Sequence, residues 1–194
     1  MIQLPQIYKI KISIEGIEPL IWRETEVPAD LFLHDFHKVI QTVMGWDNIH
    51  LHLFLKNSKT LGLADDETEQ SKNFLDYTSV RLNDILKKSG DSIIYIYDLG
   101  DNWRHNIVLN KIIDKPEKIY YPICTDGARN CPPEDCGGAH GYMEMLSILN
   151  SPGHPDQQNI LEWLEEEWDP EEFNSNIINE LLLEDDFGCM PIIE

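Results

Sequence analysis

Alternation of apolar and polar residues predicts β-strands in the first third of the chain. Residues 7–14 alternate with a period of two, the pattern of a strand that buries one face. Residues 20–27 predict a second strand, and the short break between the two, at Gly16 and Pro19, favours an antiparallel pair. Residues 49–55 alternate again and predict a third strand.

A helical period separates the second predicted strand from the third. In residues 33–44, apolar side chains recur at intervals of three and four residues, and Gly45 follows as a C-cap. Residues 80–87 predict a second, short helix. Residues 92–97 and 103–113 then predict two strands, joined by a turn rich in Asp, Gly and Asn.

The order of these elements predicts an α+β fold. The succession strand, strand, helix, strand, short helix, strand, strand is that of a ubiquitin-like β-grasp, so we expect a mixed sheet within residues 1–120. Residues 121–141 are rich in Cys, Gly and Pro and are expected to form a loop. Residues 142–194 are expected to form an acidic helical segment within a single domain, 1–194.

Three amphipathic helices are predicted after this loop. The third is expected to begin at Asp169, with Pro170 at its first helical position and Glu172 at its third. The apolar stripes are Tyr142, Met145, Leu146 and Leu149 in the first helix, Ile160, Leu161, Leu164 and Trp168 in the second, and Phe173, Ile177 and Leu181 in the third.

The formal net charge is −20, and its distribution along the chain is uneven. No Lys or Arg follows Arg129, whereas 16 of the 35 acidic residues do, so residues 130–194 carry −16. Because nucleic-acid affinity depends mainly on Lys and Arg contacts to phosphates, we expect no direct binding to duplex DNA. The acidic face is interpreted as a solvated surface that aids solubility, with a site for a basic protein partner as the alternative.

The beginning of the chain lacks the charged and apolar regions of an export signal. No apolar run approaches the roughly 20 residues that span a bilayer. The sequence therefore predicts a soluble, cytoplasmic protein that does not associate with membranes. In such a chain, clustered cysteines favour a metal site over disulfides.

Three of the four cysteines, Cys124, Cys131 and Cys136, lie within 13 residues. Thiolates in a loop rich in Gly and Pro can surround a tetrahedral ion, so we predict one structural Zn²⁺ at these three residues. Their spacing is not the paired C-x2-C of a zinc ribbon, and reduced thiols that serve packing are the alternative. The fourth ligand is left open between a water and a histidine, which could be His52, His105 or His140.

A second set of residues with metal-binding potential lies on the predicted strands. His50 and His52 are two residues apart and are expected to point to the same face. Asp98, Asp101 and His105 lie in and just after the turn of the second hairpin. If the two segments are neighbours in the sheet, these five residues form a candidate catalytic cluster. The alternative is that the histidines face outward and the aspartates only stabilise the turn.

Other chemical signals in the sequence are weak. Trp46 and Trp103, each beside turn residues, are candidates to line a groove, although most of the five tryptophans are expected in the core. The chain contains no G-x-x-x-x-G-K, G-x-G-x-x-G, G-x-S-x-G or H-E-x-x-H pattern. Standard nucleotide-binding, serine-hydrolase and zinc-protease functions therefore have no support.

Several short strings, spaced along most of the chain between Ile7 and Leu182, carry a family resemblance. They are residues 19–23, 27–30, 44–47, 50–54, 97–105, 131–138 and 141–142. Together they resemble the plasmid ORF-3-like family of the pRiA type, which is also described as the TnpR-type passenger protein of an insertion element. The resemblance implies association with mobile elements and no established reaction.

The resemblance also implies a shared polar signature. Leu99 stands where an aromatic residue is expected, Asn102 stands where Gly is common, and His140 lies outside the family motif. Recombinase chemistry is not expected, because it needs a cluster of arginines around its nucleophile and this chain has only four. The signature comprises His50, His52, Asp98, Asp101, Trp103, His105 and the cysteines Cys124, Cys131 and Cys136.

These observations favour a non-enzymatic binding or interaction module with a protein partner. An acidic face and the absence of a catalytic triad are the reasons for this preference. One alternative is a metal-dependent hydrolase or nuclease, in which an ion held by the His and Asp residues lowers the pKa of a bound water. A second alternative is an acidic protein that mimics DNA and binds a nucleic-acid enzyme.

Overall fold

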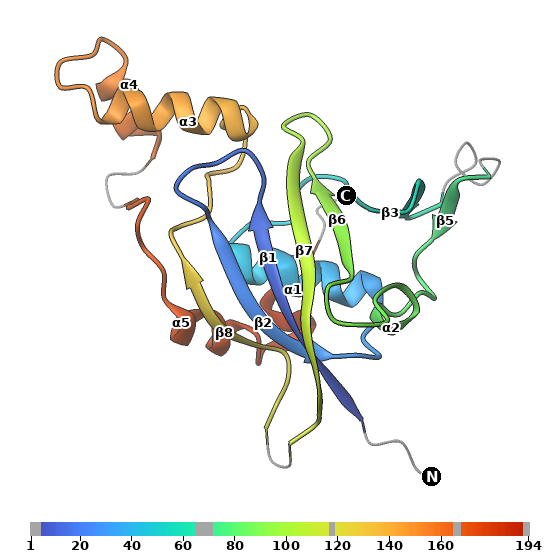
Figure 1. Cartoon of the computed structure of the whole chain (residues 1–194). Coiled ribbons are helices and arrows are strands. Elements are labelled where there is room, and N and C mark those ends of the chain that lie inside the picture. The colour runs from blue at the N-terminus through green and yellow to red at the C-terminus, as the bar shows by residue number, and fades with distance from the viewer. Residues whose placement is uncertain (1–4, 65–71, 117–118, 165–167, 192–194) are drawn as a thin grey trace.

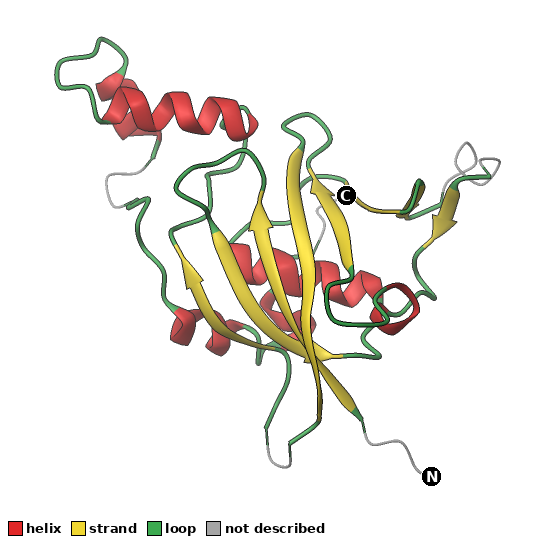
Figure 2. Cartoon of the chain, viewed as in Figure 1, coloured by secondary structure: helices red, strands yellow, loops and turns green. Residues whose placement is uncertain are grey.

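A single sheet of eight strands forms the body of the protein (Figures 1 and 2). The structure is a computed structural model that describes residues 5–64, 72–116, 119–164 and 168–191. The strands are β1 (Gln6–Ile14), β2 (Trp22–Pro28), β3 (His52–Lys56), β4 (Lys59–Gly62), β5 (Phe74–Asp76), β6 (Ser92–Tyr97), β7 (Trp103–Asp114) and β8 (Ile123–Ala128). The helices are α1 (Leu33–Met44), α2 (Leu82–Ile85), α3 (Gly138–Leu149), α4 (Gln157–Trp163), α5 (Ser175–Leu181) and the short 3-10 helix η2 (Asp185–Gly188).

Neighbouring strands follow the order β5-β4-β3-β6-β7-β1-β2-β8 across the sheet. Every pair is antiparallel except β4 and β5, which are parallel. The predicted antiparallel pair β1 and β2 and the predicted hairpin of β6 and β7 are confirmed. The α+β class is confirmed, whereas the β-grasp-like order is not, because β4, β5 and β8 extend the sheet at both edges.

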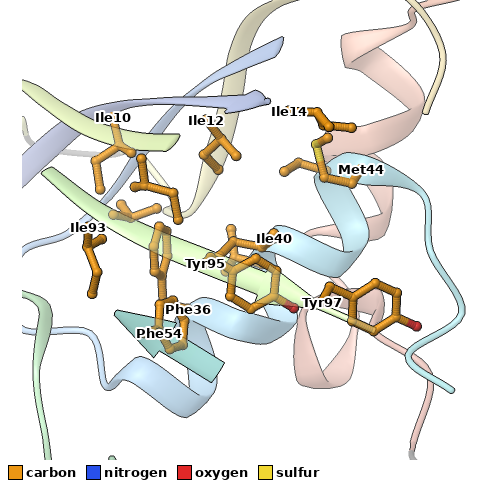
Figure 3. Close-up of a cluster of buried hydrophobic side chains, with 14 of the residues drawn as sticks. Ile10, Ile12, Ile14, Phe36, Ile40, Met44, Phe54, Ile93, Tyr95 and Tyr97 are labelled. Carbon is orange, nitrogen blue, oxygen red and sulfur yellow. The ribbon is translucent and has the colours of Figure 1, made fainter. Parts of the chain in front are cut away.

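α1 supplies one side of the hydrophobic core and lies across one face of the sheet (Figure 3). Phe36 and Ile40 of α1 are fully buried together with Ile10 and Ile12 of β1. Burying each such side chain stabilises the fold by about 1.5–3 kcal/mol. The helix ends where Gly45 adopts a φ of 84°, a left-handed conformation that glycine tolerates best, so both the helix and its C-cap were predicted correctly.

The third strand is shorter than its alternating pattern predicts. β3 begins only at His52, and residues 49–51 form a loop. Asn48 adopts a φ of 58°, and the Ile49 N–H donates to the Tyr97 hydroxyl at 3.1 Å, so this amide does not join a strand ladder. His50 therefore lies outside the strand and does not share a strand face with His52.

The predicted loop of residues 121–141 is only partly a loop. Cys124 lies on β8, which pairs with β2 at the edge of the sheet. The loop proper runs from Arg129 to Gly137, and α3 begins at Gly138. The backbone N–H and C=O groups of β8 make their hydrogen bonds with β2. The periodicity of the sequence did not predict this strand.

Three helices follow this loop in the described residues, as predicted. Figure 1 shows α3 and α4 projecting beyond one end of the sheet, while α5 lies beside β8. The predicted start of the third helix at Asp169 is wrong. α5 begins at Ser175, because the Asn174 side chain caps it by accepting hydrogen bonds from the N–H groups of Asn176 and Ile177. None of the described helices is long and apolar enough to cross a membrane.

Candidate functional site

Three loops converge at the end of the sheet where β6 turns into β7. They are the loop from α1 to β3, the turn from β6 to β7, and the loop from β8 to α3. The first loop contributes His50 and the second contributes Asp98, and the His50 Nε2 atom lies 3.7 Å from Asp98 Oδ2. The structure therefore brings together these two members of the candidate catalytic cluster.

The third loop contributes two carboxylates that the sequence reasoning missed. The His50 Nε2 atom lies 3.6 Å from Glu134 Oε2 and 3.2 Å from Asp135 Oδ1. The available signal was an acidic pair between Cys131 and Cys136 in a turn that also contains prolines. In this segment the sequence analysis predicts metal ligands at the cysteines and none at the two acidic residues between them.

Direct contacts join this third loop to the other two loops. The Trp46 indole N–H donates to the Pro132 carbonyl at 3.0 Å. Asp101 accepts a hydrogen bond from the Gly137 N–H at 3.0 Å. A Cβ atom at Gly138 would lie 2.3 Å from the Asp101 carbonyl oxygen, so the close approach requires glycine there. Asp101 thus positions the loop that carries Glu134 and does not itself join the cluster.

In Glu134 and in Asp98, one carboxylate oxygen accepts hydrogen bonds from the protein and the other does not. Glu134 Oε1 accepts from the Asp47 N–H at 3.1 Å and from the Tyr97 hydroxyl at 3.0 Å. Asp98 Oδ1 accepts from the Gly100 N–H at 2.8 Å, with Asp98 at a φ of 52°. Such supporting hydrogen bonds orient carboxylates toward a shared ligand.

The atoms at the centre of the cluster lack hydrogen-bond partners. Both His50 Nε2 and Glu134 Oε2 are buried, and neither makes a hydrogen bond. Burial raises the pKa of Glu134, and hydrogen bonds from Asp47 and Tyr97 oppose that shift. Asp135, by contrast, has a side chain that is 68 % exposed, so the cluster opens to solvent on its side.

Among the described residues, one group of three His, Cys, Asp or Glu side chains has ligand atoms all within 4.8 Å of one another, namely His50, Asp98 and Asp135. Glu134 adjoins this group through its 3.6 Å separation from His50. We call these four residues, His50, Asp98, Glu134 and Asp135, the acidic histidine cluster. A neutral imidazole and several carboxylates form a donor set suited to a divalent cation.

The other predicted members of the catalytic cluster lie elsewhere. His52 stacks on His37 with a centroid separation of 3.4 Å, and its Nε2 atom hydrogen-bonds the Tyr77 hydroxyl at 2.8 Å. His105 is fully buried, and its Nδ1–H donates to the Trp103 carbonyl at 3.0 Å. Of the five candidate residues, the structure therefore brings His50 and Asp98 together and places His52 and His105 in other surroundings.

His52 and His105, together with His37, are held neutral by their surroundings. Burial lowers the pKa of His37 to about 4 and that of His105 to about 4. Burial and the neighbouring His37 lower the pKa of His52 to about 2. A neutral imidazole packs among aromatic rings without the cost of burying a charge, so these histidines belong to the core.

The sulfur atoms of the three predicted zinc ligands do not all lie within 4.8 Å of one another. Cys124 and Cys131 are buried and Cys136 is half-buried, all three as free thiols, and they are absent from the one described ligand group. Burial raises the pKa of Cys124 to about 11 and that of Cys136 to about 12, and raises that of Cys131 as well. His140 is exposed on α3. The zinc site therefore stays a prediction, with reduced packing thiols as its alternative.

The predicted tryptophan groove is not formed either. Trp46 is 5 % exposed and Trp103 is 1 % exposed. Their rings lie 5.9 Å apart, and Trp46 also stacks on Tyr97 at 4.8 Å. Both tryptophans are therefore buried and do not line an open surface.

Comparisons with known proteins agree with the resemblance in the sequence. An uncharacterized protein, y4hQ, of Sinorhizobium fredii (strain NBRC 101917 / NGR234) is 33 % identical over 164 residues, covering 81 % of this chain and 80 % of that protein. The crystal structure of protein of unknown function MM3350 from Methanosarcina mazei Go1 matches with a TM-score of 0.82 and 35 % identity, covering 90 % of this chain and 98 % of that one. Neither description assigns an activity. Because the family model of the plasmid pRiA4b ORF-3-like protein also matches residues 6–177, the chain belongs to the plasmid pRiA4b ORF-3-like family.

Proposed function

We propose that this protein is a binding module whose acidic histidine cluster holds one divalent transition-metal ion. The observation that carries the proposal is the convergence of three carboxylates on a single buried imidazole nitrogen that has no hydrogen-bond partner. Such a nitrogen would be costly to bury if it served no ligand.

The distances within the cluster support an ion more than a set of ion pairs. Two ligand atoms that each lie about 2.1 Å from one ion, at a tetrahedral angle, are about 3.4 Å apart. The separations of His50 Nε2 from the three carboxylates are 3.2, 3.6 and 3.7 Å. All three values suit neighbours in a coordination shell, and those to Glu134 and Asp98, 3.6 and 3.7 Å, are long for direct hydrogen bonds.

The donor types narrow the choice of ion. Mg²⁺ and Ca²⁺ prefer sites made entirely of oxygen, whereas an imidazole favours Zn²⁺ or Fe²⁺ and carboxylates also suit Mn²⁺. Three carboxylates disfavour a soft ion such as Cu⁺. We therefore expect Zn²⁺ and Mn²⁺ to bind and Mg²⁺ to compete poorly.

Calorimetric titration of the metal-free protein with Zn²⁺ and with Mn²⁺ tests the proposal. Wild type should bind one ion per chain, and His50→Ala should weaken binding by at least about tenfold, because it removes the nitrogen on which the cluster centres. His154→Ala is the matched control, since His154 also lies beside a carboxylate, Asp156, at 3.8 Å but outside the cluster. Equal affinities of His50→Ala and wild type would contradict the proposal.

Metal-dependent hydrolysis is the second candidate function. The exposure of Asp135 supports it, because an ion reached from solvent can keep a coordination position for water. Release of nitrophenol from bis-p-nitrophenyl phosphate, with Zn²⁺ or Mn²⁺, separates the two functions. Turnover that is lost in His50→Ala and retained in His154→Ala would establish the hydrolase. Metal binding without turnover would favour the binding module.

A further inference from the structure

A groove between α3 and α4 adjoins the acidic histidine cluster. Its volume is about 330 Å³, at the lower end of the roughly 300–1,000 Å³ typical of ligand pockets. Asp135 lines this groove as well as the cluster, so the two features share a wall. The part of the groove away from Asp135 is built from α3 and α4, which project from the sheet in Figure 1.

The wall of the groove is apolar. Met145 and Ile148 of α3 face Ile160 and Trp163 of α4 across it. Trp163 remains 49 % exposed, although a tryptophan contributes a large apolar area when it is covered. Aromatic residues beside aliphatic ones in a concave site are typical of positions that anchor a partner.

The first turn of α3 lies unusually close to the preceding loop. A Cβ atom at Gly141 would lie 2.1 Å from the Cys136 carbonyl oxygen, so only glycine fits there. Asp135, which precedes Cys136 in this loop, lines the groove together with the apolar residues. The exposed carboxylate of Glu144, one turn along α3, lies on the rim of the same groove.

Positive charge is absent from this part of the sequence. No Lys or Arg occurs in residues 130–194, which include all of α3 and α4. The preceding arginine, Arg129, is buried and engaged, because it donates to Glu171 at 2.8 Å and to the Pro19 carbonyl at 2.8 Å. The groove thus combines an apolar wall with an acidic rim, and the helices that form it carry no Lys or Arg.

We propose that this groove binds a peptide segment of a protein partner that combines apolar side chains with Lys or Arg. The apolar side chains enter the groove between Met145 and Trp163, and the cationic groups meet Asp135 and Glu144. An acidic segment or an anionic membrane would be repelled by the same charges. This inference goes beyond the proposed metal site and does not require an ion.

Fluorescence anisotropy with three labelled peptides of equal length tests the inference. One peptide alternates leucine with lysine, the second alternates leucine with glutamate, and the third alternates serine with lysine. All titrations contain EDTA, so a failure of the metal site cannot change the result. The leucine–lysine peptide should bind at least about tenfold more tightly than either of the others, because it alone offers both kinds of contact.

Variants locate the binding on the groove. Glu144→Lys, on an exposed helix position, should weaken binding of the leucine–lysine peptide at least about threefold, through charge reversal at the rim. Glu180→Lys makes the same charge change on exposed α5 and should leave the affinity unchanged. Trp163→Ala should weaken binding about tenfold, and a thermal melt shows whether the variant remains folded.

Either of two results would overturn the inference. The first is equal affinity for the leucine–lysine and serine–lysine peptides, which would reveal nonspecific attraction to an acidic protein. The second is an equal effect of Glu144→Lys and Glu180→Lys, which would place the binding elsewhere on the surface.

Discussion

Glu134 shows how one side chain can connect the core to the candidate metal site. One of its oxygens takes hydrogen bonds from the Asp47 N–H and the Tyr97 hydroxyl, and the other is buried beside His50 without a partner. Tyr97 in turn accepts from the Ile49 N–H, next to His50 in the chain. The same contacts therefore position the imidazole and one of its carboxylates.

Glu134→Gln should separate these two roles. The amide oxygen can still accept from Asp47, so the melting temperature should change little, whereas loss of the charge should weaken Zn²⁺ binding about 10–100-fold. Calorimetry and a thermal melt measure the two effects. Glu180→Gln, on exposed α5, is the control, and a fall in stability without loss of metal affinity would assign Glu134 a purely structural role.

Among the elements, β2 is joined to its neighbours by a buried arginine. Arg23 is 3 % exposed, and its guanidinium donates to the carbonyls of Val43, Trp22 and Ala128 at 2.8, 2.9 and 3.0 Å. It thereby joins β2 to the end of α1 and to β8. Burial lowers its pKa, and nearby Cys131 and Cys124 oppose that shift.

Arg23→Met should lower the free energy of unfolding by about 3 kcal/mol, because it leaves buried carbonyl groups without donors. For a protein of this size the melting temperature should fall by about 6–12 °C. Arg104→Met is the control, since Arg104 makes an exposed pair with Glu15 and should change stability by less than about 0.5 kcal/mol. Equal melting temperatures for the two variants would show that the buried hydrogen bonds contribute little.

At the scale of the whole molecule, buried neutral histidines link stability to pH. The folded-state pKa of His37 is lowered to about 4, that of His105 to about 4 and that of His52 to about 2, whereas an unfolded histidine titrates near pH 6.5. Below about pH 6.5 the unfolded chain therefore binds protons that the folded chain excludes. Stability contributed by these histidines is complete above that pH and is lost as the pH falls.

The free energy of unfolding should fall between about pH 6.5 and pH 4, by about 1.4 kcal/mol per pH unit for each excluded proton. Urea unfolding in EDTA at several pH values measures this slope. His37→Gln should make the slope shallower, whereas His154→Gln, at a partly exposed histidine, should leave it unchanged. A free energy that is constant from pH 7 to pH 5 would contradict the assignment of neutral buried histidines.

The acidic C-terminal third also affects the whole molecule through charge alone. Residues 130–194 carry no Lys or Arg, and α3 and α4 extend this surface beyond the sheet (Figure 1). The absence of duplex DNA binding stays a prediction from this charge. The same charge is what gives the proposed peptide groove its preference for basic partners.

Local periodicity in the sequence was enough to predict α1 and the strands β1, β2, β6 and β7. The reason is that each of these elements buries one face, and burial of a face imposes a repeat of two or 3.6 on adjacent residues. The family resemblance was also readable from the sequence, because short strings of adjacent residues carry it. The acidic bias of the last third was likewise readable directly from composition.

The candidate site was decided by tertiary structure. His50, Asp98 and Glu134 come from three loops, and no repeat relates residues so far apart in the chain. Their meeting depends on contacts such as Trp46 with Pro132, which place the third loop on the end of the sheet. The cysteines likewise needed the tertiary structure to be placed. Cys124 lies on β8, whose backbone pairs with β2, whereas Cys131 and Cys136 lie in the following loop, and no local repeat predicted that strand.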